Sequence, residues 1–345
     1  MSQYTQELQA TAKAMMADNK GVLAMDESNG TCNKRFQQRG IPTTEEKRRA
    51  YRELLVTIPN LNEYVSGAIL YDETIRQSTK DGVPFPKLMQ SNGMIPGIKV
   101  DAGAKELAGH PNEKVTEGLD GLRDRIAEYY KMGARFAKWR AVITIGDGIP
   151  SRACIESNAH ALARYAALCQ EGGLVPIVEP EVLIDGNHTI ERCYEVTEQT
   201  LIAVFDQLHL QNVALDQMIL KPSMVVSGKD CPQQASVEEV ADATIKCLLD
   251  CVPASVPGIA FLSGGQSMER SSAHLNAMNA KYKQLPWRVT FSYARAIQQP
   301  ALDNWKGEDA NVEKSQKLSL HRAKCNSAAS MGQYSEEMEK QPAMV

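Results

Sequence analysis

The sequence contains no run of 18 or more apolar residues, the length that a membrane-spanning helix needs. Residues 1–20 include Glu7 and Asp18 and lack the apolar core of a secretory signal. We therefore expect residues 1–20 to form an amphipathic helix. We also expect a cytoplasmic protein with no membrane partner.

Basic residues are not in excess, because 38 Lys and Arg stand against 42 Asp and Glu, for a net charge of -4. A nucleic-acid-binding domain carries a basic patch or stripe. The charge balance therefore argues against a nucleic-acid partner.

The eight cysteines are scattered and include no C-x-x-C pair. Without a secretory signal, this usage favours reduced thiols in the cytosol. Cys247 and Cys251 are four residues apart on an expected helix and share a face. That spacing is the only sequence feature that favours a regulatory disulfide between them.

The chain also lacks a P-loop and a G-x-G-x-x-G after a strand, which disfavours a doubly wound nucleotide-binding sheet. Short apolar segments instead alternate with longer helical patterns, and such alternation indicates parallel strand pairing. Eight units in about 300 residues fit an α/β fold of the (β/α)8 TIM barrel type. We predict a single-domain barrel over residues 1–320 and a mobile C-terminal tail over 321–345. The expected strands are Val22–Asp26, Gly67–Tyr71, Ile95–Val100, Phe136–Ile143, Leu174–Glu181, Met218–Pro222, Gly258–Gly264 and Arg288–Tyr293. The expected helices include Thr44–Ile58, Gly118–Met132, Arg152–Glu171, Ile190–Gln207, Ser236–Leu249 and Met268–Lys281.

Three of the apolar strands carry charges where a buried strand normally has none. They are Phe136-Ala137-Lys138-Trp139-Arg140, Val175-Pro176-Ile177-Val178-Glu179-Pro180-Glu181 and Met218-Ile219-Leu220-Lys221-Pro222. Active sites of this barrel form at the carboxyl ends of the strands, and side chains alternate faces along each strand. We therefore expect Lys138 and Arg140 to face the barrel mouth, together with Glu179 and Glu181. Asp26 ends the first strand at the same mouth.

Two lysines beside carboxylates indicate amine chemistry. Burial and a neighbouring cation both lower the pKa of a lysine, which frees its lone pair for attack on a carbonyl. Either Lys138 or Lys221 fits as nucleophile, with the other as its neighbour. The residues also fit a structural alternative in which both lysines are buried ion-pair partners of Glu179, Glu181 or Asp26.

Two further groups indicate anion binding. Ser263, Gly264 and Gly265 follow the seventh strand, where glycine lets backbone N–H groups approach a phosphate. Ser292 and Arg295 follow the eighth strand, and phosphate sites after these two strands are frequent in this barrel. Lys99 and Arg140 lie on other strands and suit a second anion. The substrate expected from this pattern is small and carries a phosphate at each end.

None of the six histidines ends a strand or forms an H-E-x-x-H or H-x-H pair, as a divalent-metal lyase would need. We therefore expect neither a catalytic metal nor a cofactor.

These motifs resemble those of the class I fructose-bisphosphate aldolases over about residues 4–334. The resemblance implies a metal-free (β/α)8 barrel, usually a homotetramer. It also implies reversible cleavage of fructose 1,6-bisphosphate to dihydroxyacetone phosphate and glyceraldehyde 3-phosphate, in glycolysis and gluconeogenesis or in the Calvin cycle. The motifs are Leu23-Ala24-Met25-Asp26-Glu27-Ser28, Gly97-Ile98-Lys99-Val100-Asp101, Ala137-Lys138-Trp139-Arg140, Glu179-Pro180-Glu181, Leu220-Lys221-Pro222, Leu262-Ser263-Gly264-Gly265 and Phe291-Ser292-Tyr293.

The resemblance implies a role for each matched residue. Lys221 corresponds to the Schiff-base lysine and Lys138 to the lysine that assists carbinolamine formation. Glu179 corresponds to the general acid/base, Asp26 to the group near the C4 hydroxyl, and Glu181 to a supporting carboxylate. The implied substrate-binding residues are Lys99, Arg140, Ser263, Gly264, Gly265, Ser292, Arg295, Ser28 and Arg35.

Two positions depart from the family pattern. Vertebrate and plant members end in a tyrosine that helps protonate the enamine, whereas residues 341–345 contain no tyrosine and Tyr334 lies too early to be equivalent. We expect removal of residues 336–345 to lower activity less than removal of the tail does in those relatives. Ala294 stands before Arg295 where relatives carry glycine, which would strain the backbone if φ there were positive.

Two alternatives remain at this point. One is a Schiff-base aldolase that prefers sedoheptulose 1,7-bisphosphate, which shares the ketose-phosphate end. The other is a catalytically silent scaffold barrel, which would be expected to have lost Lys221, Glu179 or Asp26.

Overall fold

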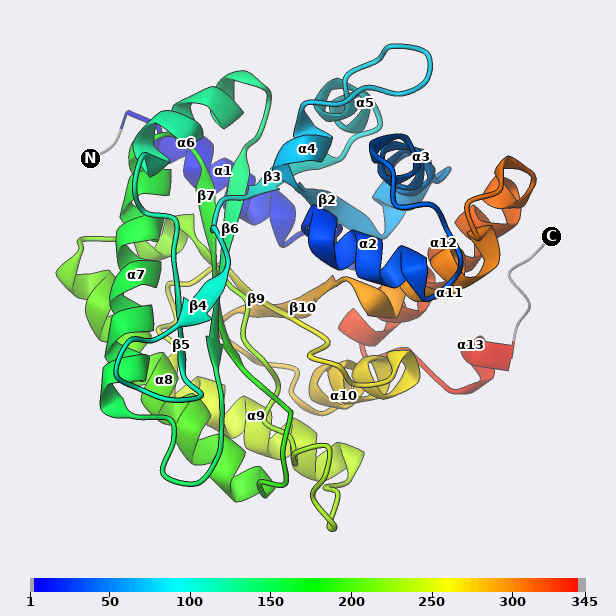
Figure 1. Cartoon of the computed structure of the whole chain (residues 1–345). Helices are drawn as coiled ribbons and strands as arrows, with labels where there is room; N and C mark the ends of the chain where they lie inside the picture. Colours follow the sequence, from blue (N-terminus) through cyan, green and yellow to red (C-terminus); the bar gives the residue numbers. More distant parts are fainter. Residues whose placement is uncertain (1–2, 341–345) are drawn as a thin grey trace.

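The computed structural model describes residues 3–340, and eight parallel strands in it close into a barrel (Figure 1). Around the barrel the order is β1-β10-β9-β8-β7-β6-β3-β2. All eight strands lie where the sequence pattern predicts them, which confirms the (β/α)8 fold. Their bounds are Gly21–Ala24 (β1), Val65–Leu70 (β2), Ile95–Lys99 (β3), Phe136–Ile143 (β6), Val175–Val182 (β7), Ile219–Leu220 (β8), Gly258–Phe261 (β9) and Arg288–Tyr293 (β10).

The helices surround the barrel, and the six predicted ones are present. Two of them, α7 (Arg152–Glu171) and α10 (Met268–Lys281), match their predicted bounds residue for residue. The others are α3 (Glu45–Val56), α6 (Leu122–Lys131), α8 (Ile190–Leu210) and α9 (Val237–Cys251). Side chains cap several N-termini; at α9, Ser236 and Glu239 form a reciprocal capping box. No helix in residues 3–340 is both long and apolar enough to cross a membrane.

A helix at the N-terminus closes one end of the barrel. Helix α1 (Thr5–Met15) lies within the span predicted to be amphipathic. Its Leu8, Ala12 and Met15 pack with the interior side chains at the beginnings of the strands, such as Phe136 and Val175. This packing leaves the carboxyl ends of the strands as the open mouth.

Phe136 fills the barrel interior against glycine backbone. A Cβ at Gly97 would lie 2.1 Å from a ring carbon of Phe136, which is far inside van der Waals contact. The glycine in β3 therefore makes room for this ring, as expected where a side chain approaches a strand closely.

Several elements had no clear sequence signal. They are the hairpin of β4 (Ala104–Glu106) and β5 (Lys114–Thr116), and the helices α2 (Asn29–Gln37), α4 (Asp72–Ile75), α5 (Phe85–Ser91), α11 (Arg295–Trp305), α12 (Val312–Ser330) and α13 (Glu337–Lys340).

The predicted start of a tail at residue 321 is wrong. Helix α12 (orange in Figure 1) runs without a break from Val312 to Ser330 and packs against α3, α10 and α11. Arg322 and Asn326 in it are buried. The residues of the predicted tail that follow Lys340, 341–345, lie outside the described residues.

The tail prediction failed because the buried face of α12 is polar. Arg322 donates to the carbonyls of Ala296 (3.2 Å) and Met268 (3.1 Å) and to Ser272 Oγ (2.8 Å). Asn326 Oδ1 accepts from Ser272 Oγ at 2.7 Å. Buried polar groups are stable when they are hydrogen-bonded, so this helix needs no apolar stripe of the kind that sequence patterns detect.

A buried histidine of α10 makes stability depend on pH. His274 is 1% exposed, and its Nδ1 lies 2.6 Å from Oε1 of Gln266. Burial, and secondarily Arg270, lowers the pKa of His274 to about 4. The folded state therefore favours neutral His274, whereas the unfolded chain protonates it below about pH 6.5. Its stabilising effect is complete above that pH and is lost as the pH falls from about 6.5 to about 4, by about 3 kcal/mol in total.

We predict that His274→Asn flattens the acid side of the stability profile. The fall in Tm between pH 7 and pH 5 should be smaller in this variant than in the unsubstituted protein, because the titrating group is gone. Thermal unfolding at the two pH values measures it. His209→Asn, at an exposed position of α8, is the matched control and should leave the fall unchanged. An equal fall in the His274 variant would contradict the prediction.

Candidate active site

A cavity of about 810 Å³ opens at the carboxyl ends of the barrel strands. Its wall includes the five residues predicted to be catalytic and eight of the nine predicted to bind substrate. Gly265 is the exception, because it borders a smaller cavity of about 190 Å³ beside Lys229 and Arg270. The predicted residues on the main wall are Asp26, Lys138, Glu179, Glu181, Lys221, Lys99, Arg140, Ser263, Gly264, Ser292, Arg295, Ser28 and Arg35.

Four buried side chains form a row of alternating charge across the floor of this cavity. Lys138 Nζ lies 3.0 Å from Asp26 Oδ2 and 2.9 Å from Glu179 Oε2. The other oxygen of Glu179 lies 3.3 Å from Lys221 Nζ. None of the four residues is more than 8% exposed. The row joins β1, β6, β7 and β8, so it exists only when these strands are in register.

The row distinguishes the two lysines that the sequence pattern left interchangeable. Burial alone lowers the pKa of Lys138, but its contacts with Asp26 and Glu179 outweigh burial and hold that pKa well above its usual range. Lys221 contacts one carboxylate instead of two. Burial, reinforced by the charge of Lys138, lowers the pKa of Lys221 despite Glu179. Lys221 is therefore the lysine with the more available lone pair.

Asp26 is held in its ionised form. Burial by itself raises the pKa of this carboxyl, but Lys138 and then Lys221 outweigh burial and lower the pKa to about 2. At neutral pH Asp26 therefore carries a negative charge and is able to accept a proton.

Two more ion pairs lie on the wall beside the row. Arg140 and Glu181 point into the mouth from neighbouring strands and pair through Nε and Oε2. The side chain of Arg140 is 43% exposed, whereas that of Glu181 is 7% exposed. Lys99 Nζ lies 2.7 Å from Oδ1 of Asp101, a partner that sequence reasoning missed. Both cations keep contact with the cavity.

The loop after β9 has the backbone geometry of an anion site. Gly264 and Gly265 adopt φ of +57° and +91°, in the left-handed region that favours glycine. A Cβ at Gly265 would lie 3.3 Å from both Arg295 Nη2 and Lys229 Nζ. Two cations thus approach this loop, and sequence reasoning had identified only Arg295. Ala294 has φ of -99°, so the alanine there causes no left-handed strain.

Helix α2 forms one side of the mouth, and little in its sequence pattern marks its residues as part of the site. Ser28 accepts from the N–H of Thr31 (3.3 Å) and caps the helix. Arg35 pairs with Glu27, which also binds Arg52 at 2.7 Å. Arg39, one turn after Arg35, lines the cavity too, and that i, i+4 spacing of arginines was the available signal.

Charge on the wall favours an anionic ligand. Seven cationic side chains and five carboxylates line the cavity, for a formal charge of +2. A small molecule with a phosphate at each end complements that excess.

A sequence model of class I fructose-bisphosphate aldolase, described as glycolytic, matches residues 7–344. The chain belongs to this family. It is 62% identical over 330 residues to the probable fructose-bisphosphate aldolase class 1 of Xanthomonas campestris pv. campestris, covering 95% of this chain and 98% of that relative. It is 51% identical over 340 residues to fructose-bisphosphate aldolase 3, chloroplastic, of Arabidopsis thaliana. That match covers 99% of this chain and 86% of the relative.

A solved structure of the family agrees with the fold. The fructose-bisphosphate aldolase of Plasmodium falciparum, in complex with TRAP and a small-molecule inhibitor, superposes with a TM-score of 0.95 at 44% identity. The match covers 97% of each chain. The family resemblance stated from the motifs is confirmed, and the relatives named as aldolases support an enzyme of glycolytic aldol cleavage.

Tyr334, the last tyrosine of the chain, does not reach the mouth. It is 8% exposed and lies outside the cavity wall. Its hydroxyl donates to Glu339 Oε1 at 2.9 Å. In this structure Tyr334 therefore helps anchor the C-terminal segment.

We predict that Lys138→Met raises the pKa of Lys221. The substitution removes a neighbouring cation and leaves two carboxylates to stabilise the Lys221 ammonium. The pH midpoint of Lys221 acylation, followed by peptide mass spectrometry, should rise by about one unit or more. Lys229→Met lies outside the row and is the control. An unchanged or lower midpoint in a variant with a native circular dichroism spectrum would contradict this electrostatic account.

Proposed function

We propose that this cavity cleaves fructose 1,6-bisphosphate through an imine on Lys221. The observation that carries the proposal is the buried row Asp26–Lys138–Glu179–Lys221, which combines an amine of lowered pKa with two carboxylates. No metal ligand set is needed for this chemistry, because the protonated imine is itself the electron sink.

Imine formation uses Lys221 and Glu179. The neutral amine of Lys221 attacks C2 of the open-chain ketose and forms a carbinolamine. Glu179, 3.3 Å from that amine, donates the proton with which the C2 hydroxyl leaves as water. Lys138 carries a fixed positive charge beside this position and stabilises the developing negative charge on oxygen.

Carbon–carbon cleavage uses Asp26. The ionised carboxylate accepts the C4 hydroxyl proton as the C3–C4 bond breaks, which releases glyceraldehyde 3-phosphate and leaves an enamine on Lys221. Because the contact with Lys138 makes Asp26 a weak base, proton transfer requires that contact to lengthen. Protonation at C3 and hydrolysis of the imine then release dihydroxyacetone phosphate and regenerate Lys221.

The two phosphates fit two cationic regions of the wall. We assign one to Ser263, Gly264, Ser292 and Arg295, near the glycine loop after β9. Ser292 is 1% exposed, and its Oγ has no hydrogen-bond partner within the described chain. This hydroxyl is therefore available to a ligand. We assign the other phosphate to Lys99 and Arg140, together with Ser28, the N-cap of α2, and Arg35 within that helix.

We predict that borohydride with dihydroxyacetone phosphate inactivates the enzyme by reducing an imine on Lys221. Peptide mass spectrometry should find one reduced adduct on that residue, and initial rates of aldol cleavage should be insensitive to a chelator. Lys221→Ala should lose the adduct and almost all cleavage. An adduct on a different residue, or full activity in Lys221→Ala, would refute the assignment.

We also propose that the chain works as a homotetramer in a reducing compartment, the cytosol. All eight cysteines are free thiols, which supports the reducing compartment, although one relative is named chloroplastic. Ile202 and Leu210 of α8 and Leu249 of α9 are large apolar side chains about half or more exposed, which supports burial against another subunit. Sedimentation equilibrium should give four times the monomer mass, and a monomer at micromolar concentration would contradict it.

A further inference from the structure

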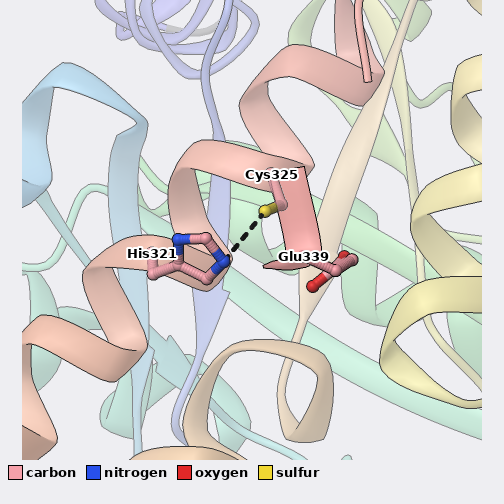
Figure 2. A group of neighbouring side chains, drawn as sticks. All are labelled: His321, Cys325 and Glu339. Atoms are coloured by element: carbon pink, nitrogen blue, oxygen red, sulfur yellow. Dashed lines mark hydrogen bonds between the residues drawn. The ribbon is translucent and has the colours of Figure 1, made fainter. Parts of the chain in front are cut away.

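Three side chains with metal-binding atoms meet where helix α12 contacts the C-terminal helix α13. His321 and Cys325 stand one turn apart on α12, and Glu339 comes from α13 (Figure 2). Their donor atoms all lie within 4.8 Å of one another. None of the three lines the catalytic cavity.

The spacing of the first two donors fits a tetrahedral metal. His321 Nε2 and Cys325 Sγ are 3.6 Å apart. A zinc ion bound at the usual Zn–N and Zn–S lengths holds two such donors about 3.6 Å apart. The i, i+4 placement of two ligands on one helical face is also how H-E-x-x-H motifs present their histidines to zinc.

Glu339 is held near this pair by two neighbouring side chains. Both of its carboxylate oxygens contact Nη1 of Arg322, and Tyr334 Oη donates to Oε1 at 2.9 Å. A carboxylate offers about four lone-pair directions, so these bonds leave room for a metal. Hydrogen bonds of this kind fix the orientation of ligating carboxylates in metal sites.

The donor set favours zinc. Thiolate sulfur and imidazole nitrogen select Zn²⁺ over Mg²⁺ and Ca²⁺, which prefer oxygen. One thiolate and one carboxylate balance the charge of the ion. Three protein ligands leave one tetrahedral position for water. Cys325 is buried, whereas His321 and Glu339 are half-buried, so the cluster lies at the edge of the packed shell.

We propose that His321, Cys325 and Glu339 bind one zinc ion that ties helix α13 to helix α12. The ion adds a second link beside the pairing of Arg322 with Glu339, and Arg322 also bonds to α10 through Met268 and Ser272. Zinc thereby holds residues near 334–340 against the barrel shell. A mixed His–Cys pair on one helix is neither a histidine pair nor a strand end, so those two sequence signals do not detect it.

The test uses the full chain, reduced and freed of metal by dialysis against chelator. Titration with Co²⁺ should produce a thiolate-to-cobalt charge-transfer band and the visible absorption of tetrahedral cobalt, both saturating at one equivalent. One equivalent of Zn²⁺ should abolish both signals. Zn²⁺ should also raise Tm and slow tryptic cleavage at Lys340 relative to the metal-free chain.

Variants identify the ligands. Cys325→Ser should lose the charge-transfer band, and His321→Asn and Glu339→Gln should each weaken zinc binding at least about tenfold in competition with a chromophoric chelator. Cys251→Ser, which alters the half-exposed thiol of α9, is the matched control and should bind as the unsubstituted chain does. All variants should retain aldol cleavage, since none of these residues lines the cavity, and that activity verifies folding.

Three results would overturn the proposal. They are the absence of a one-equivalent cobalt signal, a signal that survives in Cys325→Ser, and a signal lost in Cys251→Ser. If Cys325→Ser fails to fold, undiminished zinc affinity in Glu339→Gln would also overturn it, leaving His321 and Cys325 as an ordinary helix contact. Borohydride trapping on Lys221 is independent of all these outcomes.

Discussion

The buried row of alternating charges is the constraint on which the mouth of this barrel depends. The ionisable ends of two lysines and two carboxylates are almost fully removed from water, which is costly for any charged group unless it contacts its opposite. Asp26, Lys138, Glu179 and Lys221 meet this condition only in the closed barrel, because they lie on or just after four different strands. The register of the strands and the electrostatics of the site are therefore fixed together. The position of Lys221 at the end of the row, beside one carboxylate instead of two, makes it chemically different from Lys138.

The C-terminal shell follows the same physical rule around one buried charge, the guanidinium of Arg322. Arg322 is 3% exposed, and it joins α12 to α10, α11 and α13 through carbonyls, a hydroxyl and a carboxylate. The shell is thus held by hydrogen bonds and an ion pair between residues that are separated in sequence. The proposed zinc site lies next to this arginine, and Glu339 belongs to the site and also pairs with Arg322. One carboxylate of a four-residue helix therefore connects the end of the described chain to the rest of the fold.

Much of the barrel and of its mouth could be predicted because both produce local patterns in the sequence. Strands β6 and β10 and helices α7 and α10 have the predicted bounds, since their periodicity and flanking residues are clear. The polar residues at strand ends were found because an apolar run that ends in a charge is conspicuous. Strand β8 is shorter than predicted, at two residues, and Lys221 follows it immediately. Helix α2 was missed because its residues are mostly polar and small and present no apolar stripe.

Other features depend on contacts that no local pattern carries. Gly264 borders the main cavity, whereas the adjoining Gly265 borders the smaller one, and both glycines have positive φ. Lys229 reaches the glycine loop from a segment 36 residues earlier in the sequence. Helix α12 extends ten residues beyond the boundary predicted for the barrel, because its polar face finds partners on α10 and α11.

The sequence by itself determined the eight alternating units and the identity of the charged residues at the strand ends, because strand and helix periods are local properties of the chain. Only the tertiary structure decided which lysine has its pKa lowered, which cation each carboxylate pairs with, and where the ordered C-terminal shell extends. Those outcomes depend on burial and on distances between residues that are separated in sequence, by as many as 112 positions for Asp26 and Lys138. Closure of the barrel sets those distances, and the order of residues along the chain does not contain them.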